Sequence, residues 1–356
     1  MKKLFGVFLS MVLLLGIPTV SLANTTTQAT SKITVERVYG DNRYDTAIAI
    51  ADRMAVDLKN DGQFNNIVLA SGTNWPDALA GGPLAAYLEA PILLLNTTPE
   101  GSKKTLSYVE QHLAKDKNIY ILGGKGVVPQ SFTDSLIQMG YKAENIHQIG
   151  GKDRQETSLL IAKMLPNPSR VYLVSSNNYY DATTISSYAS QSNLPILLVN
   201  PNGLTQEQKE YCDSFNTVVT AGELCKTINQ IYPKGAENMI EGENRYGTNA
   251  AGLRWDVRDE TMYLTTGENW PDSLAGGALA GIEGGGGIIL TKPNELPPET
   301  IEALNYIAYF GHSYERWPDP TRHVYPKLVV LGGPGAVSDE VVKQATEILN
   351  SQGYSW

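Results

Sequence analysis

The chain has 356 residues, of which 42% are apolar and 18% are charged, and its formal net charge is −9. This composition is typical of folded globular domains, and it excludes a largely disordered or low-complexity chain. The length is sufficient for two or three ordinary domains, and the acidic balance leads us to expect no nucleic-acid partner.

The first 23 residues have the pattern of a secretory signal peptide. Lys2 and Lys3 precede a long apolar run, and Ser21-Leu22-Ala23 places small residues where signal peptidase requires them. We expect residues 1–23 to be removed, which takes away two lysines and changes the formal net charge from −9 to −11. The mature chain is expected to be secreted, to contain no membrane segment and to begin with a flexible spacer at residues 24–32. An uncleaved membrane anchor is the alternative.

A short polar motif occurs three times and marks a repeated unit. In each copy a glycine is followed after three residues by an arginine and after three more by a threonine. The copies occupy residues 40–46, 151–157 and 242–248, and a stretch with helical spacing follows each of them. The arginine is therefore predicted to begin a helix. The repetition predicts three modules, at residues 33–142, 143–234 and 235–356.

A second motif follows in each module, between an apolar run and a helix-like stretch. It reads Gly-Thr-Asn-Trp-Pro-Asp at residues 72–77 and Gly-Glu-Asn-Trp-Pro-Asp at residues 267–272, and a glycine pair comes shortly afterwards. The copy at residues 176–186 is divergent, because tyrosine replaces tryptophan and the glycine pair is absent. Short apolar strands alternate with helices in each module, which predicts an α/β fold of Rossmann-like modules with parallel sheets. We expect no cofactor.

Charged residues of the two motifs are the sharpest candidates for a binding site. Arg43, Arg154 and Arg245 are predicted to begin helices, where a cation interacts unfavourably with the helix dipole, so another contact must favour them. Each guanidinium either binds an anionic ligand or pairs with an acid across a module interface. The aspartates of the second motif either contact a ligand or cap their own helices. They are Asp77, Asp181 and Asp272.

Several other features leave two interpretations open. The aromatic residues of the second motif, Trp75, Trp270 and the substituted Tyr179, form either a ligand platform or interface anchors. Cys212 and Cys225 either form a disulfide or remain free thiols. The aromatic and arginine-containing insertion at residues 309–323 either binds a saccharide or folds back on the third module.

Motifs for metal binding or catalysis are absent from the sequence. The four histidines lie outside the repeated motifs, and the glycine-rich segments at residues 123–126 and 332–335 favour tight turns over phosphate-binding loops. A glycosidase needs only two carboxylates, so that class stays open. We nevertheless expect a binding protein without a metal, because linked copies of one weak site increase avidity.

The two motifs, the later Ile-Leu-Leu and Leu-Gly-Gly segments and their threefold repetition resemble the type 2 cell-wall-binding repeat of clostridial and bacillar surface proteins. The resemblance implies three Rossmann-like modules around a pseudo-threefold axis. It also implies non-covalent binding to an anionic secondary polymer of the Gram-positive wall, of the teichoic-acid or polysaccharide type, at the cell surface. The predicted ligand-binding residues are Arg43, Arg154, Arg245, Asp77, Asp181, Asp272, Asn74, Asn269, Trp75 and Trp270.

Two other functions agree with the same resemblance. Such repeats also occur on wall amidases, so an autolysin-type amidase or an amidase modifier, with peptidoglycan as partner, is one alternative. A surface adhesin whose insertion faces a host ligand is the other. The identity of the polymer, the participation of the divergent module and the oligomeric state stay open at the level of the sequence.

Overall fold

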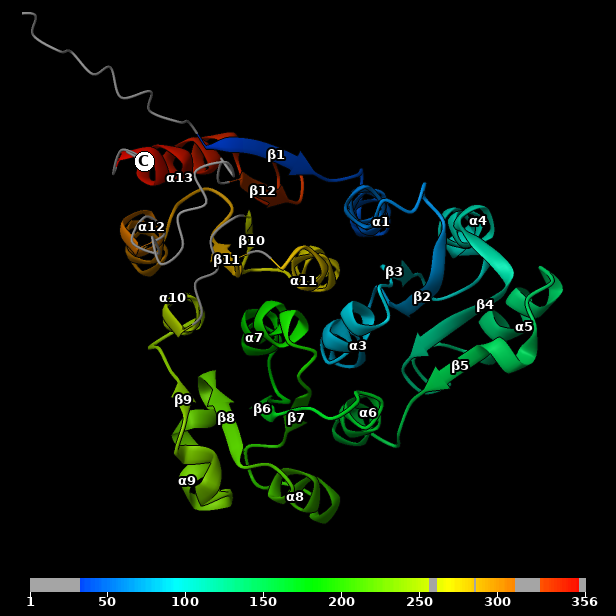
Figure 1. Cartoon of the computed structure of the whole chain (residues 1–356), viewed down its shortest axis with the longest axis horizontal. Coiled ribbons are helices and arrows are strands. Elements are labelled where there is room, and N and C mark those ends of the chain that lie inside the picture. The colour runs from blue at the N-terminus through cyan, green and yellow to red at the C-terminus, as the bar shows by residue number, and fades with distance from the viewer. Residues whose placement is uncertain (1–32, 256–260, 285, 311–326, 352–356) are drawn as a thin grey trace, which may run out of the picture.

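The structure is a computed structural model that describes residues 33–255, 261–284, 286–310 and 327–351. Within these residues the protein has an α/β fold with three separate sheets, each of four parallel strands. Figure 1 shows the sheets around a centre where α3 (Gly82–Tyr87), α7 (Tyr180–Gln191) and α11 (Pro271–Glu283) meet. The predicted α/β class with parallel sheets is confirmed. The predicted signal peptide, the spacer and the insertion beyond Phe310 lie outside the described residues.

The first sheet is built around β2 (Phe64–Ser71), in strand order β3-β2-β4-β5. Residues 67–70 of β2 are fully buried, because helices cover a parallel sheet on both faces and its strands must be apolar at successive positions. The other strands are β3 (Ile92–Leu95), β4 (Leu113–Leu122) and β5 (Ile146–Ile149). The helices of this part are α1 (Arg43–Leu58), α2 (Pro76–Leu79), α3, α4 (Lys103–His112) and α5 (Gln130–Gln138).

The second and third sheets repeat this strand order, as β7-β6-β8-β9 and β11-β10-β12-β1. The second part contains α6 (Arg154–Ala162), β6 (Arg170–Ser175), α7, β7 (Ile196–Val199), α8 (Gln206–Asp213), β8 (Thr217–Ala221), α9 (Cys225–Ile231) and β9 (Met239–Ile240). The third contains α10 (Arg245–Trp255), β10 (Thr261–Thr266), α11, β11 (Ile288–Thr291), α12 (Pro298–Phe310), β12 (Lys327–Leu331) and α13 (Asp339–Ser351), together with β1 (Thr34–Val38).

The strand that opens each repeat lies in the sheet of the preceding repeat. β5 pairs with β4, β9 pairs with β8, and β1 pairs with β12, which is almost 300 residues away in the sequence and closes the ring. Arg37 fixes β1 there, since its Nη1 donates to the carbonyls of Gly332 and Val337, each at 2.9 Å. Each sheet therefore contains three strands of one repeat and the first strand of the next. The repeat period in the sequence does not show this, because it does not identify the sheet to which an edge strand is added.

A cluster of charged side chains joins the first and third repeats beside β1. Arg53 on α1 contacts Glu36 of β1, Asp57 of its own helix and Glu283 at the end of α11, and Lys327 of β12 also contacts Glu36. One outer oxygen each of Asp57 and Glu283 is buried without a hydrogen-bond partner among the described residues. Burial, followed by the neighbouring Asp57, raises the pKa of Glu283 to about 8.

The centre of the ring explains the missing glycine pair of the second repeat. Gly82, Ser186 and Gly277 occupy equivalent positions of α3, α7 and α11. A Cβ atom added to Gly82 would lie 2.5 Å from the Oγ atom of Ser186, and one added to Gly277 would lie 2.2 Å from it. Since these distances are far below van der Waals contact, only one of the three helices has room for a side chain. The second repeat supplies it.

At the preceding helix position, the size of the helix residue and the size of the strand residue that it contacts change together. A Cβ atom added to Gly81 or Gly276 would lie 2.1 Å from the Cδ1 atom of a leucine, Leu122 in one case and Leu331 in the other. The second repeat instead has isoleucine on the helix and alanine on the strand, and both are fully buried. The larger side chain has moved from the strand to the helix, and the summed volume of the pair changes by only about one methyl group, a kind of exchange that cores tolerate well.

Candidate functional site

Each predicted arginine is the first residue of a helix, and the preceding Asn or Asp caps that helix. In the first repeat Asn42 accepts hydrogen bonds from the amides of Tyr44 and Asp45, and Asp153 and Asn244 act in the same way. This geometry directs all three guanidinium groups to the second motif of their own repeats. The Nη1 atoms donate to backbone carbonyls there: Arg43 to Gly72 (2.6 Å), Arg154 to Ser176 (2.7 Å) and Arg245 to Gly267 (2.6 Å).

Each guanidinium also lies over an aromatic side chain of the repeat that precedes its own in the circular arrangement. The distances from Cζ to the ring centroid are 5.6 Å for Arg43 over Trp270, 5.3 Å for Arg154 over Trp75, and 5.7 Å and 4.3 Å for Arg245 over Tyr179 and Tyr180. These are cation–π distances. The three junctions between repeats thus share one construction, and the predicted tryptophans lie at interfaces.

The arginines form no ion pair with any of the described side chains. The acid that lies near Arg43 is Asp272 of the preceding repeat, and the Arg43 charge opposes the effect of burial, which raises the pKa of Asp272 to about 6. Within the described part, Nε and Nη2 of the three guanidinium groups donate no hydrogen bond. Each half-buried guanidinium therefore keeps donors that have no partner among the described residues.

Asp181 shows what the aspartate of the second motif does in a fully described junction. It is buried, and its Oδ2 atom accepts hydrogen bonds from the Nδ2 atom of Asn178 (3.1 Å) and from the amide of Glu223 (3.0 Å). The carboxylate thus binds the turn after β8 and does not cap α7, so the capping interpretation is wrong for this residue. Burial raises the pKa of Asp181 to about 6, although these two hydrogen bonds oppose the change.

The glycine turns after the strands make room for these aspartates. Gly222 has a φ of 66°, and a Cβ atom there would lie 1.9 Å from Oδ1 of Asp181. Gly332 has a φ of 110°, and its Cβ atom would lie 2.6 Å from Oδ2 of Asp272. The positive φ of Gly332 agrees with the tight turn that the sequence favoured, and the missing side chains of Gly222 and Gly332 also leave room for the aspartates. The side chain of Asp77 lies outside the described residues.

The predicted asparagines play different parts. Asn74 and Asn269 are exposed, and their hydrogen bonds among the described residues lie within the local turn. The amide of Asn74 donates to Ser71 Oγ, and Asn269 Oδ1 accepts from the amide of Trp270 at 3.0 Å. Asn178, at the equivalent position of the second repeat, is buried and donates both to Asp181 and to Oε2 of Glu223 (2.8 Å). The structure does not bring Asn74 or Asn269 into contact with the arginines.

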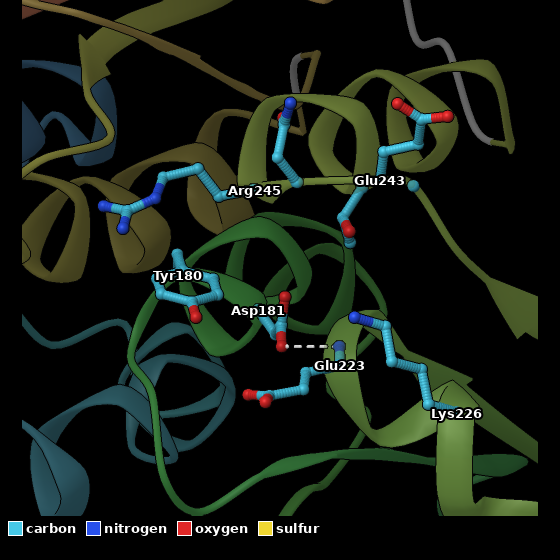
Figure 2. A pocket seen from close by; sticks show the side chains of 9 residues that line it. Tyr180, Asp181, Glu223, Lys226, Glu243 and Arg245 are labelled. Carbon is cyan, nitrogen blue, oxygen red and sulfur yellow. Dashed lines mark hydrogen bonds between the residues drawn. The ribbon is translucent and has the colours of Figure 1, made fainter.

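A pocket of about 270 Å³ lies at the junction of the second and third repeats (Figure 2). It contains the predicted residues Asp181 and Arg245. It also contains residues that sequence analysis missed. The full lining is Tyr180, Asp181, Glu223, Lys226, Gly242, Glu243, Asn244, Arg245 and Thr248. The available signal was the divergence of the second repeat, which has Tyr180 where the other repeats have proline and Glu223 where they have glycine.

Several other sequence questions are answered in the described part of the chain. Cys212 and Cys225 are free and buried, and burial raises the pKa of each thiol to about 12. The described His, Cys, Asp and Glu side chains include no group of three that could hold a metal ion. Among the helices between residues 33 and 351 that the structure describes, none combines the length and apolar character of a membrane span.

Three tandem α/β units that share one junction design define a protein assembled from repeated modules. The chain belongs to the family Cell wall binding domain 2 (CWB2), whose pattern matches residues 37–133, 148–228 and 239–342. The predicted membership and threefold repetition are confirmed. The family is one of cell-wall-binding domains.

Similar proteins are known among wall enzymes and surface proteins. N-acetylmuramoyl-L-alanine amidase LytC of Bacillus subtilis (strain 168) is 28% identical over 254 residues, which cover 69% of this chain and 48% of LytC. The amidase enhancer of the same organism is 28% identical over 269 residues, which cover 74% of this chain and 35% of the enhancer. The chain thus matches less than half of the length of either relative.

Two solved structures from Clostridium difficile share the fold. Cwp8 has a TM-score of 0.75 and 24% identity, and the match covers 90% of this chain and 52% of Cwp8. Cwp6 has a TM-score of 0.73 and 23% identity, and the match covers 92% of this chain and 49% of Cwp6. At these identities the likeness concerns the fold alone.

Proposed function

We propose that this protein is exported and binds, through the junctions between its repeats, an anionic secondary polymer of the Gram-positive wall, of the teichoic-acid or polysaccharide type. The observation that supports this is the state of Arg43, Arg154 and Arg245. Each guanidinium is held by one backbone carbonyl and at least one aromatic ring, and Arg245 also donates to the hydroxyl of Tyr179, yet each keeps donors without a partner among the described residues. A planar, preoriented guanidinium fits phosphate or carboxylate groups.

The chain has an acidic net charge, so it can bind an anionic polymer only where its surface carries a local positive potential. The arginines meet that condition, because they recur at three equivalent junctions and are not paired with described carboxylates. Binding of a repeating polymer at three linked sites gives avidity from contacts that are weak individually. It should also weaken as salt screens the charges. The signal-peptide pattern of residues 1–23 supports export to the surface.

Sedimentation with purified cell walls tests the proposal. Arg154→Ala should weaken wall binding about tenfold, as expected when a charge-assisted contact is lost. Arg154→Lys keeps the charge without the fork and should be intermediate. The matched control is Arg170→Ala, since Arg170 begins β6 of the same repeat, at the end of the strand remote from the Arg154 contact at Ser176. Urea midpoints of all three variants show whether folding is intact.

Removal of phosphodiester-linked polymers from the walls with hydrofluoric acid separates this proposal from its competitors. Binding should disappear on removal. Binding that survives removal points to peptidoglycan instead, and failure to bind any wall preparation refutes the proposal.

The names of the two Bacillus relatives make an amidase or an amidase modifier the second candidate function. We propose that the three modules bind and do not cleave, because three repeated units suit multivalent binding and no catalytic motif is present in the sequence. Incubation of the purified protein with peptidoglycan tests this. Release of new N-terminal L-alanine would overturn the assignment.

A further inference from the structure

The divergent residues of the second repeat converge on one pocket. At the turn after β8 the chain has Glu223 and Lys226, whereas the first and third repeats have glycine at the first position and valine or alanine at the second. Tyr180 replaces the proline of the other two repeats. All three line the pocket at the junction with the third repeat, opposite Arg245. The divergence is therefore concentrated where a ligand could reach it.

This pocket presents both signs of charge without pairing them. Asp181 is only 1% exposed, and Oδ2 is occupied by the amide of Glu223 and by Asn178, whereas Oδ1 accepts no hydrogen bond from a described residue. Figure 2 shows this second oxygen pointing away from Glu223, towards the space below Arg245 and Glu243. Neither Lys226 nor Arg245 forms an ion pair with a described carboxylate. Figure 2 shows the amine of Lys226 pointing towards Asp181, whereas the guanidinium of Arg245 points away from Lys226, beyond the ring of Tyr180.

We propose that this pocket binds a unit that carries an ammonium group close to a phosphate or carboxylate group. The ammonium is held by Oδ1 of Asp181 and by Glu223, and the anionic group is held by Lys226. The ring of Tyr180, over which the Arg245 guanidinium lies at 4.3 Å, forms a wall of the pocket. The assignment rests on the proposed function in one respect, namely that the unit belongs to the wall polymer, as an amino sugar or an amino-acyl ester.

The arrangement suits such a ligand better than a simple polyanion. Three carboxylates, those of Asp181, Glu223 and Glu243, line the pocket against two cations, so a purely anionic unit would meet net repulsion. A buried carboxylate oxygen is poorly hydrated and therefore interacts strongly with an ammonium group that replaces water. The other two junctions lack counterparts of Glu223 and Lys226, so the proposal assigns amine recognition to this junction alone.

The burial of Asp181 adds a pH dependence. The pKa of this residue is raised to about 6 by burial, against the opposing effects of its hydrogen bonds and of Arg245, while the charge of Glu223 raises it further. The charged groups that face it are Glu223 and Lys226 from the turn and α9, and Glu243 and Arg245 from the start of α10. Ammonium binding should therefore weaken as the pH falls through about 6.

Calorimetric titration of the purified chain with three sugars tests the proposal without any wall material. The probes are glucosamine 6-phosphate, its N-acetylated form and unphosphorylated glucosamine. We expect the first to bind about tenfold more tightly than either of the others, the factor that corresponds to loss of one charge-assisted contact. Glu223→Gln should remove most of the preference for the amine, and Lys226→Gln most of the preference for the phosphate. Glu207→Gln, on the exposed surface of α8 in the same repeat, is the control.

The outcomes separate this proposal from the proposed function. Equal affinity for the amine and its N-acetylated form, or no effect of Glu223→Gln, overturns amine recognition even if walls are bound. Discrimination between the sugars in a protein that binds no wall supports the pocket and refutes wall anchoring. Where walls are bound, mild alkaline hydrolysis removes amino-acyl esters and spares amino sugars. A selective loss of binding by the wild type, and not by Glu223→Gln, identifies the ester as the source of the amine, and retention identifies the amino sugar.

Discussion

Gly281→Ala is predicted to destabilise the ring at its centre. Gly281 lies in α11, where a new Cβ atom would be 2.5 Å from the Cβ atom of Ser190 on α7, 2.9 Å from the Ser190 carbonyl carbon and 2.9 Å from the Cβ atom of Ala86 on α3. None of these atoms is the end of a flexible side chain. The three helices must therefore move apart.

Two effects of opposite sign determine the magnitude. Replacing glycine by alanine inside a helix stabilises it by about 1 kcal/mol. Overpacking of a close-packed core costs about 1–3 kcal/mol, and the three simultaneous contacts of Gly281 place it at the upper end. Separation of the helices also weakens dispersion contacts along the whole interface. We therefore expect a net loss of about 2 kcal/mol in the free energy of unfolding.

Urea denaturation followed by tryptophan fluorescence measures this loss as a lower midpoint at unchanged slope. Gly335→Ala is the matched control, because a Cβ atom there meets nothing within 4 Å, and it should leave stability unchanged or raise it by about 0.4–1 kcal/mol. Adding Ser190→Gly to Gly281→Ala removes the 2.5 Å contact and should restore part of the loss. A Gly281→Ala protein as stable as the wild type would refute the idea that this centre is limited by steric contact.

Two further predictions concern buried ionisable groups. Glu283 has a pKa raised to about 8 in the folded protein, so the folded state binds more protons than the unfolded state between about pH 4.5 and 8. Relative to Glu283→Gln, wild-type stability should fall as the pH rises through this window and level off above it; parallel pH profiles of the two proteins would contradict the assignment. Cys212 and Cys225 are buried with pKa values raised to about 12, so a thiol reagent at pH 8 should modify them only after unfolding, and rapid modification of the native protein would show that the core opens.

The repeat and the fold class could be predicted because they depend on local signals. Apolar strands, glycine turns and the helix starts at Arg43 and its equivalents are visible in the order of residues alone. The aromatic partners of those arginines could not be predicted in this way. The side chain under Arg43 is Trp270, which belongs to the third repeat and is far away in the sequence. The position of β1 in the third sheet escaped prediction for the same reason, since the contact spans almost the whole described chain.

Only some residues of the candidate site could be predicted from the sequence. A motif common to three repeats identified Asp181 and Arg245, but it could not identify Glu223 and Lys226, which are defined by their difference from the other repeats. The interpretation of Asp181 as a helix cap was wrong because its carboxylate accepts a hydrogen bond from the amide of Glu223, in the turn after β8. That amide is 42 residues away in the sequence. Long-range proximity decided both points.

The divergence of the second repeat has two separate physical origins. At the axis, three identical helices cannot all carry a side chain at the position of Gly82, Ser186 and Gly277, so a ring of three repeats that fills its centre must be asymmetric there. That requirement says nothing about Glu223 or Lys226, which lie in a turn at the edge of the same repeat and contribute no contact at the axis. Glu223 accepts one hydrogen bond from Asn178, and Lys226 forms no ion pair with a described carboxylate. The ligand proposed for this junction accounts for both substitutions, which packing at the axis does not require.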